Sequence, residues 1–151
     1  MDELKFAVIG NPVSHSLSPD IHLFFASQFQ LERYTYNKIK SNENDFERDI
    51  NDFFKNGGVG LNVTVPFKGL AYNLCDELDQ SAGLCKSVNT VLIDSGKLIG
   101  HSTDGQGLID DFLHKEITLE DSKILIIGAG GSAASIISSL LFPVSYTHLR
   151  A

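Results

Sequence analysis

Residues 60–68 read G-L-N-V-T-V-P-F-K and combine a strand pattern with a lysine just beyond its end. Apolar and polar residues alternate, so a strand would turn Asn62 and Thr64 to one face of a sheet and the valines to the other. Pro66 cannot donate a ladder hydrogen bond, and we expect the strand to end there. Lys68 would then lie in a loop or first helical turn past the strand's carboxyl end, where open α/β sheets bind ligands. Taken alone, the stretch also fits an ordinary strand followed by a solvated lysine.

The composition is that of a globular protein and argues against several classes of partner. Of the 151 residues, 42% are hydrophobic and 21% are charged, which suits one domain and part of a second. The net charge is -7 and the twelve Lys and Arg residues are scattered, which argues against nucleic-acid binding. No apolar run approaches the roughly 20 residues of a membrane span. The first residues do not resemble a signal peptide, so we expect a cytoplasmic protein with neither a membrane nor a nucleic-acid partner.

Two cysteines, Cys75 and Cys85, have no His or Cys at metal-ligand spacing. We predict buried free thiols and no metal site, with a disulfide or a metal site as the alternatives.

Strand and helix patterns alternate along the first hundred residues. Runs at 5–9, 33–40 and 61–65 predict strands, whereas helical spacing predicts helices after Pro19, over 44–55, through 71–75 and around 78–84. Such alternation is typical of a parallel sheet with crossover helices. Residues 87–93 and 97–100 predict a hairpin that forms an antiparallel edge. The sequence therefore predicts an α/β fold with a mixed, mostly parallel sheet flanked by helices.

Two serines precede the first predicted helix. We expect Ser18 to be its N-cap and Pro19 its first residue, with Ile21, Phe24, Phe25 and Phe29 along one side. Ser16 and Ser18 then lie just outside a helix N-terminus, where hydroxyl and backbone N–H groups can converge on an anion such as a carboxylate. Alternatively, Ser18 is only a cap and Ser16 only a polar loop residue.

A second pattern begins at Lys123. Residues 124–127 (I-L-I-I) predict a short buried strand, and the turn that follows opens a helix through Ile136, Ile137 and Leu140. This is the strand, G-x-G-x-x-A, helix order of a dinucleotide-binding fingerprint, in which glycines let the backbone close on a pyrophosphate. The candidate cofactor-binding residues are Gly128, Ala129, Gly130, Gly131, Ser132 and Ala133.

Five motifs together resemble the shikimate dehydrogenase family in order and spacing. They are G-N-P-V (10–13) with H-S-L-S-P (15–19), N-V-T-V-P-F-K (62–68), V-N-T (88–90), T-D-G (103–105) and G-A-G-G (128–131). The resemblance covers about residues 4–141. It implies a first domain that binds shikimate, a second that binds NADP, and reversible reduction of 3-dehydroshikimate to shikimate.

The resemblance also implies roles for individual residues. Ser16 and Ser18, with help from Thr64, would bind the substrate carboxylate, and Asn62, Asn89 and Asp104 would hold the ring hydroxyls. Lys68 and Asp104 would be the catalytic pair, since an ammonium held by a carboxylate can both stabilise and protonate a developing alkoxide. From the residues alone, Asp104 also fits the N-cap of the helix that follows it.

The resemblance implies a division into three parts. We expect a shikimate-binding catalytic domain over 1–104, a connecting helix and linker over 105–122, and the first strand and helix of a Rossmann domain over 123–151. From Pro143 the sequence no longer resembles the family, so we expect the cofactor domain to be cut short. Ser102 and the pair at 86–87 also differ from the residues usual in the family.

The resemblance leads to one main functional prediction and three alternatives. We predict an NADP-dependent shikimate dehydrogenase acting on a small-molecule substrate as a monomer or homodimer. The alternatives are a quinate or dual quinate/shikimate dehydrogenase, a catalytically silent module that binds the same sugar acid, and an inactive fragment.

Overall fold

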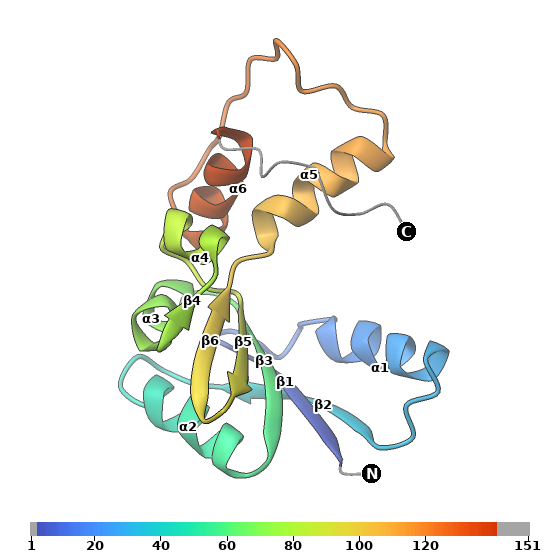
Figure 1. Cartoon of the computed structure of the whole chain (residues 1–151), viewed down its shortest axis with the longest axis vertical. Helices are drawn as coiled ribbons and strands as arrows, with labels where there is room; N and C mark the ends of the chain where they lie inside the picture. Colours follow the sequence, from blue (N-terminus) through green and yellow to red (C-terminus); the bar gives the residue numbers. More distant parts are fainter. Residues whose placement is uncertain (1–2, 142–151) are drawn as a thin grey trace.

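The computed structural model describes residues 3–141 and has an α/β fold built on one six-stranded mixed sheet. The strands are β1 (Leu4–Gly10), β2 (Tyr34–Lys40), β3 (Gly58–Val63), β4 (Glu77–Leu78), β5 (Thr90–Asp94) and β6 (Lys97–His101). The helices are α1 (Ser18–Gln28), α2 (Phe46–Lys55), α3 (Lys68–Leu74), α4 (Gln80–Cys85), α5 (Asp104–His114) and α6 (Gly131–Leu141). The strand order is β2-β1-β3-β5-β6-β4 (Figure 1). The predicted fold class is confirmed.

Three parallel strands form the part of the sheet that the alternating pattern predicted. β1 lies between β2 and β3 and pairs in parallel with both. Ala7 and Ile9 belong to the larger core cluster together with Ile50 of α2. Val8 points the other way, into a smaller cluster on the face that α1 covers. Because both faces are covered, β1 has a continuous apolar sequence.

The hairpin of β5 and β6 is antiparallel, as predicted, but it is not the edge of the sheet. β5 pairs with β3, and β6 is flanked by the short parallel strand β4. Leu78 belongs to β4, whereas the sequence predicted that a helix begins there. α4 begins only at Gln80, because the Asp79 side chain accepts a hydrogen bond from the Ala82 N–H at 2.7 Å and caps the helix there.

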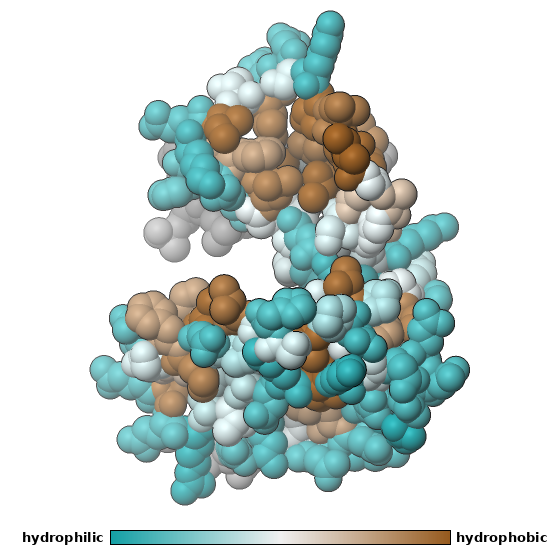
Figure 2. Space-filling view, turned by 180° about the vertical axis from the view of Figure 1, so that it is seen from behind, coloured by the Kyte–Doolittle hydropathy of each residue, from teal (hydrophilic) through white to brown (hydrophobic). Residues whose placement is uncertain are grey.

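Helix α1 differs from its prediction at both its start and its apolar side. Leu17 occupies the N-cap position without a side-chain cap bond, and the Ser18 hydroxyl accepts a hydrogen bond from Ser16 at 3.1 Å. The expected apolar side exists, yet Phe24 is 59% exposed and Phe29 74% exposed. In Figure 2, brown side chains gather over α1, on the left of the lower half of the molecule. No described segment covers them, and Ala26 is the buried residue of the helix.

The strand predicted at 124–127 is not formed. Leu125 is 85% and Ile127 91% exposed, and the segment has no strand assignment. A parallel strand takes its hydrogen bonds from neighbouring strands, and residues 3–141 supply none beside it. The helix predicted after the glycine-rich turn is α6, which packs against α5 and α4 (Figure 1). The tail predicted to be foreign, from 143, lies outside the described residues.

Two further observations complete the fold. Cys75 and Cys85 are free thiols, as predicted, but only Cys85 is buried and Cys75 is half-buried. Among residues 3–141, no helix is both long enough and apolar enough to cross a membrane.

Candidate active site

The Lys68 side chain lies in a nearly enclosed position. β3 ends at Val63, Pro66 follows, and Lys68 is the first residue of α3, as the position of the proline predicted. Its side chain is only 11% exposed. The ammonium Nζ donates hydrogen bonds to the Asp104 carboxylate and, at 2.9 Å, to the Ser132 hydroxyl. A lysine buried to this degree needs a negative partner, and Asp104 provides it.

Asp104 is held through both carboxylate oxygens. Oδ2 accepts from Lys68, and Oδ1 accepts from the Asn89 Nδ2 at 2.7 Å. Asp104 is the first residue of α5, and the N-cap position belongs to Thr103. The carboxylate is therefore used in the cluster and does not cap the helix, which resolves the alternative that the sequence left open.

The side-chain amides of Asn89 and Asn62 have defined orientations. A carboxylate can only accept, so the Asn89 atom that contacts Asp104 is the donor Nδ2. A backbone N–H can only donate, so the Asn89 atom that contacts the Thr103 N–H, at 3.1 Å, is the acceptor Oδ1. The Thr90 hydroxyl donates to the same Oδ1, so its lone pair accepts from the Asn62 Nδ2 at 3.2 Å. The Asn62 Oδ1 must then face the other way, as an acceptor. A continuous chain of hydrogen bonds thus joins Asn62 to Lys68.

The structure places the two predicted serines together and leaves Thr64 apart. The Ser16 hydroxyl donates to that of Ser18 at 3.1 Å and accepts from the Ser18 N–H at 3.2 Å. The Thr64 methyl group lies against Gly10, where an added Cβ would come within 2.3 Å. Among the described residues, the Thr64 hydroxyl makes no hydrogen bond with either serine.

The glycine-rich turn lies against Lys68. A Cβ added to Gly131 would come within 2.6 Å of the Ser87 Oγ and 3.1 Å of the Lys68 Cβ. Only a glycine allows this approach. The Ser87 hydroxyl is buried and has no hydrogen-bond partner among residues 3–141. Gly131 begins α6, so the residues present fit a phosphate-bearing cofactor at a helix N-terminus close to the lysine.

Sequence reasoning missed two groups that the structure adds to this region. Tyr36 of β2 donates from its hydroxyl to the Asn62 Oδ1 at 2.6 Å. Ser135 of α6 is buried, shares a 2.9 Å hydrogen bond with Ser102 and accepts from the Gly105 N–H at 3.0 Å. The alternation of β2 could have indicated that Tyr36 points inward, but no local pattern ties Ser135 to a residue 33 positions earlier.

Comparison with known proteins identifies the family. The family model described as "Shikimate dehydrogenase substrate binding domain" matches residues 8–91. The chain belongs to the shikimate dehydrogenase family. Shikimate dehydrogenase (NADP(+)) of Acinetobacter baylyi is 43% identical over 137 residues, which are 91% of this chain and 52% of the relative. The chain thus spans about half the length of the curated relative it matches.

Solved shikimate dehydrogenases have the same fold. The Thermus thermophilus structure in complex with NADP(H) and shikimate is 31% identical, with a TM-score of 0.86 over 93% of this chain and 53% of that one. The Aquifex aeolicus shikimate dehydrogenase is also 31% identical and has a TM-score of 0.86, over 92% of this chain and 52% of that one. This shikimate dehydrogenase family chain therefore corresponds to about half of each solved protein.

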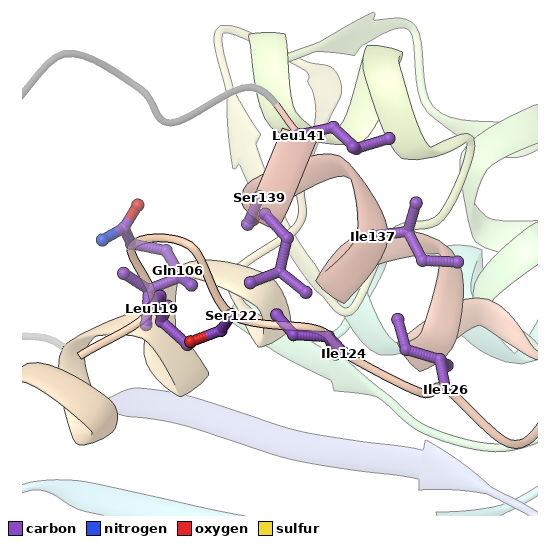
Figure 3. A pocket seen from close by; sticks show the side chains of 10 residues that line it. Gln106, Leu119, Ser122, Ile124, Ile126, Ile137, Ser139 and Leu141 are labelled. Carbon is purple, nitrogen blue, oxygen red and sulfur yellow. The ribbon is translucent and has the colours of Figure 1, made fainter. Parts of the chain in front are cut away.

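An apolar hollow lies apart from the cluster around Lys68. It has a volume of about 510 Å³ and is bounded by α5, by the segment 119–126 and by α6. Figure 3 shows Ile124, Ile126 and Ile137 lining it. None of the predicted site residues lines this hollow. In this shikimate dehydrogenase family member, the polar cluster and the hollow are therefore separate features.

Proposed function

We propose that this chain is the substrate-binding part, with the beginning of the cofactor-binding part, of an NADP-dependent shikimate dehydrogenase. The complete enzyme would reversibly reduce 3-dehydroshikimate to shikimate, an oxidoreductase step in aromatic amino acid and chorismate biosynthesis. The observation that carries the proposal is the Lys68–Asp104 pair, which lies between the carboxyl end of β3 and the glycine-rich turn. The names of the relatives, one of them solved with shikimate and NADP(H), support it.

The substrate would be held at both of its polar ends. We assign the carboxylate to Ser16 and Ser18, whose hydroxyls already lie within hydrogen-bonding distance of each other, with Thr64 in a lesser role. The ring hydroxyls are assigned to Asn62, Asn89 and Asp104. Amide and carboxylate groups suit a polyhydroxylated ring, because an amide can donate to or accept from a hydroxyl and a carboxylate can accept from one.

Lys68 and Asp104 would move the proton. When the ketone of 3-dehydroshikimate is reduced, negative charge develops on its oxygen. The Lys68 ammonium would both stabilise this charge and donate a proton to the oxygen. In the reverse direction the pair accepts the proton of the substrate hydroxyl. Because the two groups are in direct contact, the proton belongs to the pair and not to either residue alone. NADPH, when bound, supplies the hydride that reaches the carbonyl carbon.

The domain boundaries follow the same proposal. Residues 1–104 would form the shikimate-binding domain, 105–122 the connecting helix and linker, and 123–151 the start of the Rossmann domain. The cofactor turn would comprise Gly128, Ala129, Gly130, Gly131, Ser132 and Ala133. The small residues of this turn, and its place at the N-terminus of α6, support the assignment.

The cellular setting is also part of the proposal. An acidic chain with scattered basic residues suits a cytoplasmic enzyme that acts on a small molecule, with neither nucleic acid nor membrane as a partner. A monomer or a homodimer is the expected assembly.

Calorimetric titration of the chain with shikimate, and then with NADP, tests the proposal. We expect saturable heat with shikimate and a much smaller response to quinate, which serves as the matched control ligand. Lys68→Ala and Asn89→Ala should both weaken the binding of shikimate. If shikimate gave no saturable heat, and a chimeric enzyme joining residues 1–141 to the second half of the Acinetobacter baylyi relative did not oxidise it, the proposed function would be wrong.

A further inference from the structure

Tyr36 occupies an unusual place for a strand tyrosine. Only 5% of it is exposed, and its hydroxyl donates to the Asn62 Oδ1 at 2.6 Å. The His22 ring of α1 stacks on it with centroids 4.3 Å apart and planes inclined by 15°. Ser18 is close enough to influence the ionisation of the Tyr36 hydroxyl. The phenol therefore lies between the serine pair and the asparagine amides.

The direction of the hydrogen bond to Asn62 is fixed by residues far from Tyr36. Asp104 can only accept, so Asn89 donates to it through Nδ2. Thr90 then donates to the Asn89 Oδ1, and the Asn62 Nδ2 donates to the Thr90 hydroxyl. The Asn62 Oδ1 is left as an acceptor that faces Tyr36. Burial raises the pKa of Tyr36 to about 12, an effect that Ser18 partly offsets, so the phenol keeps its proton and remains a donor at neutral pH.

We propose that Tyr36 is a positioning residue for substrate binding: by donating to the Asn62 Oδ1 it holds the Asn62 amide with its Nδ2 turned toward the ring-hydroxyl side of the site. This inference rests on the proposed function, since the occupant is the polyhydroxylated acid assigned to this site. An amide can flip by half a turn at little steric cost, and a flipped Asn62 would present an acceptor where Nδ2 now donates to Thr90. Tyr36 penalises that flip, because it would leave the buried phenol facing an N–H₂ group.

Tyr36→Phe removes the hydroxyl and keeps the ring that stacks on His22. We expect a roughly threefold to tenfold rise in the shikimate Kd measured by calorimetry, the size expected for one lost neutral hydrogen bond. Tyr34→Phe is the matched control: it removes a hydroxyl from the same strand and the same face, where the nearest partner is the His22 Nδ1 at 3.4 Å. The control should stay within about twofold of the wild-type Kd, well below the effect of a full hydrogen bond.

A double-mutant cycle separates positioning from a general structural effect. If Tyr36 acts through Asn62, then Tyr36→Phe should change the shikimate Kd by less than about twofold in an Asn62→Ala background. An equal loss in both backgrounds would overturn the inference. The outcome that Tyr36→Phe binds shikimate as well as the wild type does would also overturn it.

Nuclear magnetic resonance provides a reading that does not depend on shikimate. The side-chain N–H₂ signals of Asn62 should shift and exchange faster in Tyr36→Phe, while those of Asn56 should not change. Unchanged Asn62 signals would overturn the positioning role. If these signals change but the wild-type chain does not bind shikimate, the proposed function is wrong, and the inferred role of Tyr36 in substrate binding is wrong with it. Only the hydrogen bond between Tyr36 and Asn62 would then be supported.

Discussion

Ser102, directly after β6, and Ser135, in the middle of α6, share a hydrogen bond of 2.9 Å, and both side chains are buried. Ser135 also accepts the Gly105 N–H at 3.0 Å, one of the free N–H groups at the start of α5. A single hydroxyl thus joins α6 to the end of the sheet and to α5. Ser102 stands where the sequence differed from its family, and Ser135 is its partner.

Ser135→Ala should destabilise this junction. The substitution leaves the Ser102 hydroxyl and the Gly105 N–H buried without a partner, which costs about 1–3 kcal/mol. Chemical denaturation followed by circular dichroism, with hydrogen exchange of the α6 amides, measures the loss. Ser138→Ala on the same helix is the control, since the Ser138 hydroxyl makes no hydrogen bond in the part of the chain that the structure describes. Equal stability of the two variants would contradict the prediction.

Gly131→Ala should push the glycine-rich turn away from Lys68. The new methyl group would meet the Ser87 Oγ at 2.6 Å, and we expect a loss of roughly 1–3 kcal/mol, as for other overpacked sites. Because the Ser87 hydroxyl has no hydrogen-bond partner within the described part of the chain, adding Ser87→Ala should recover part of the loss. Thermal unfolding of the single and double variants measures both effects.

Gly107→Ala is the control for that experiment. Gly107 lies within α5, and an added Cβ would meet nothing within 4 Å. There the substitution should stabilise the chain by about 0.5–1 kcal/mol, the usual gain of replacing a helical glycine. If Gly131→Ala also stabilised the chain, the turn would not lie as close to Lys68 as the structure places it.

The stability of the chain should fall above pH 10 because of Tyr36. Burial raises the pKa of its hydroxyl to about 12, from an ordinary value of 10.0. The unfolded chain therefore loses this proton first, so the stabilising contribution is complete below pH 10 and is lost as the pH rises toward 12. The full difference is roughly 3 kcal/mol. Urea unfolding between pH 9 and pH 11.5 should show a shallower decline for Tyr36→Phe than for the wild type; parallel declines would contradict this.

The sequence predicted the parts of this fold that depend on local chemistry. The strand ends before Pro66, Lys68 lies at the start of α3, and the five motifs led to the family. What it missed depends on residues that are distant in the chain. The strand at 124–127 has the right side chains but no neighbour to pair with, and the apolar side of α1 was predicted without knowing that Phe24 and Phe29 would be exposed. Tyr36 and Ser135 enter the site region only through contacts with Asn62 of β3 and with Ser102, the residue after β6.

Lys68→Met gives the sharpest test of the catalytic pair. Methionine fills nearly the same volume but can neither stabilise an alkoxide nor donate a proton, so kcat for shikimate oxidation should fall by roughly 10²–10⁴-fold. The reference is the chimeric enzyme that joins residues 1–141 to the second half of the Acinetobacter baylyi relative. Lys55→Met, at the exposed C-terminus of α2, removes the same charge far from Asp104 and should leave kcat within about twofold, since an isolated surface charge contributes little. The binding of shikimate should weaken much less than turnover, because Asn62, Asn89 and the serine pair remain in place. Turnover of Lys68→Met equal to that of Lys55→Met would show that the ammonium held by Asp104 does not carry the proton.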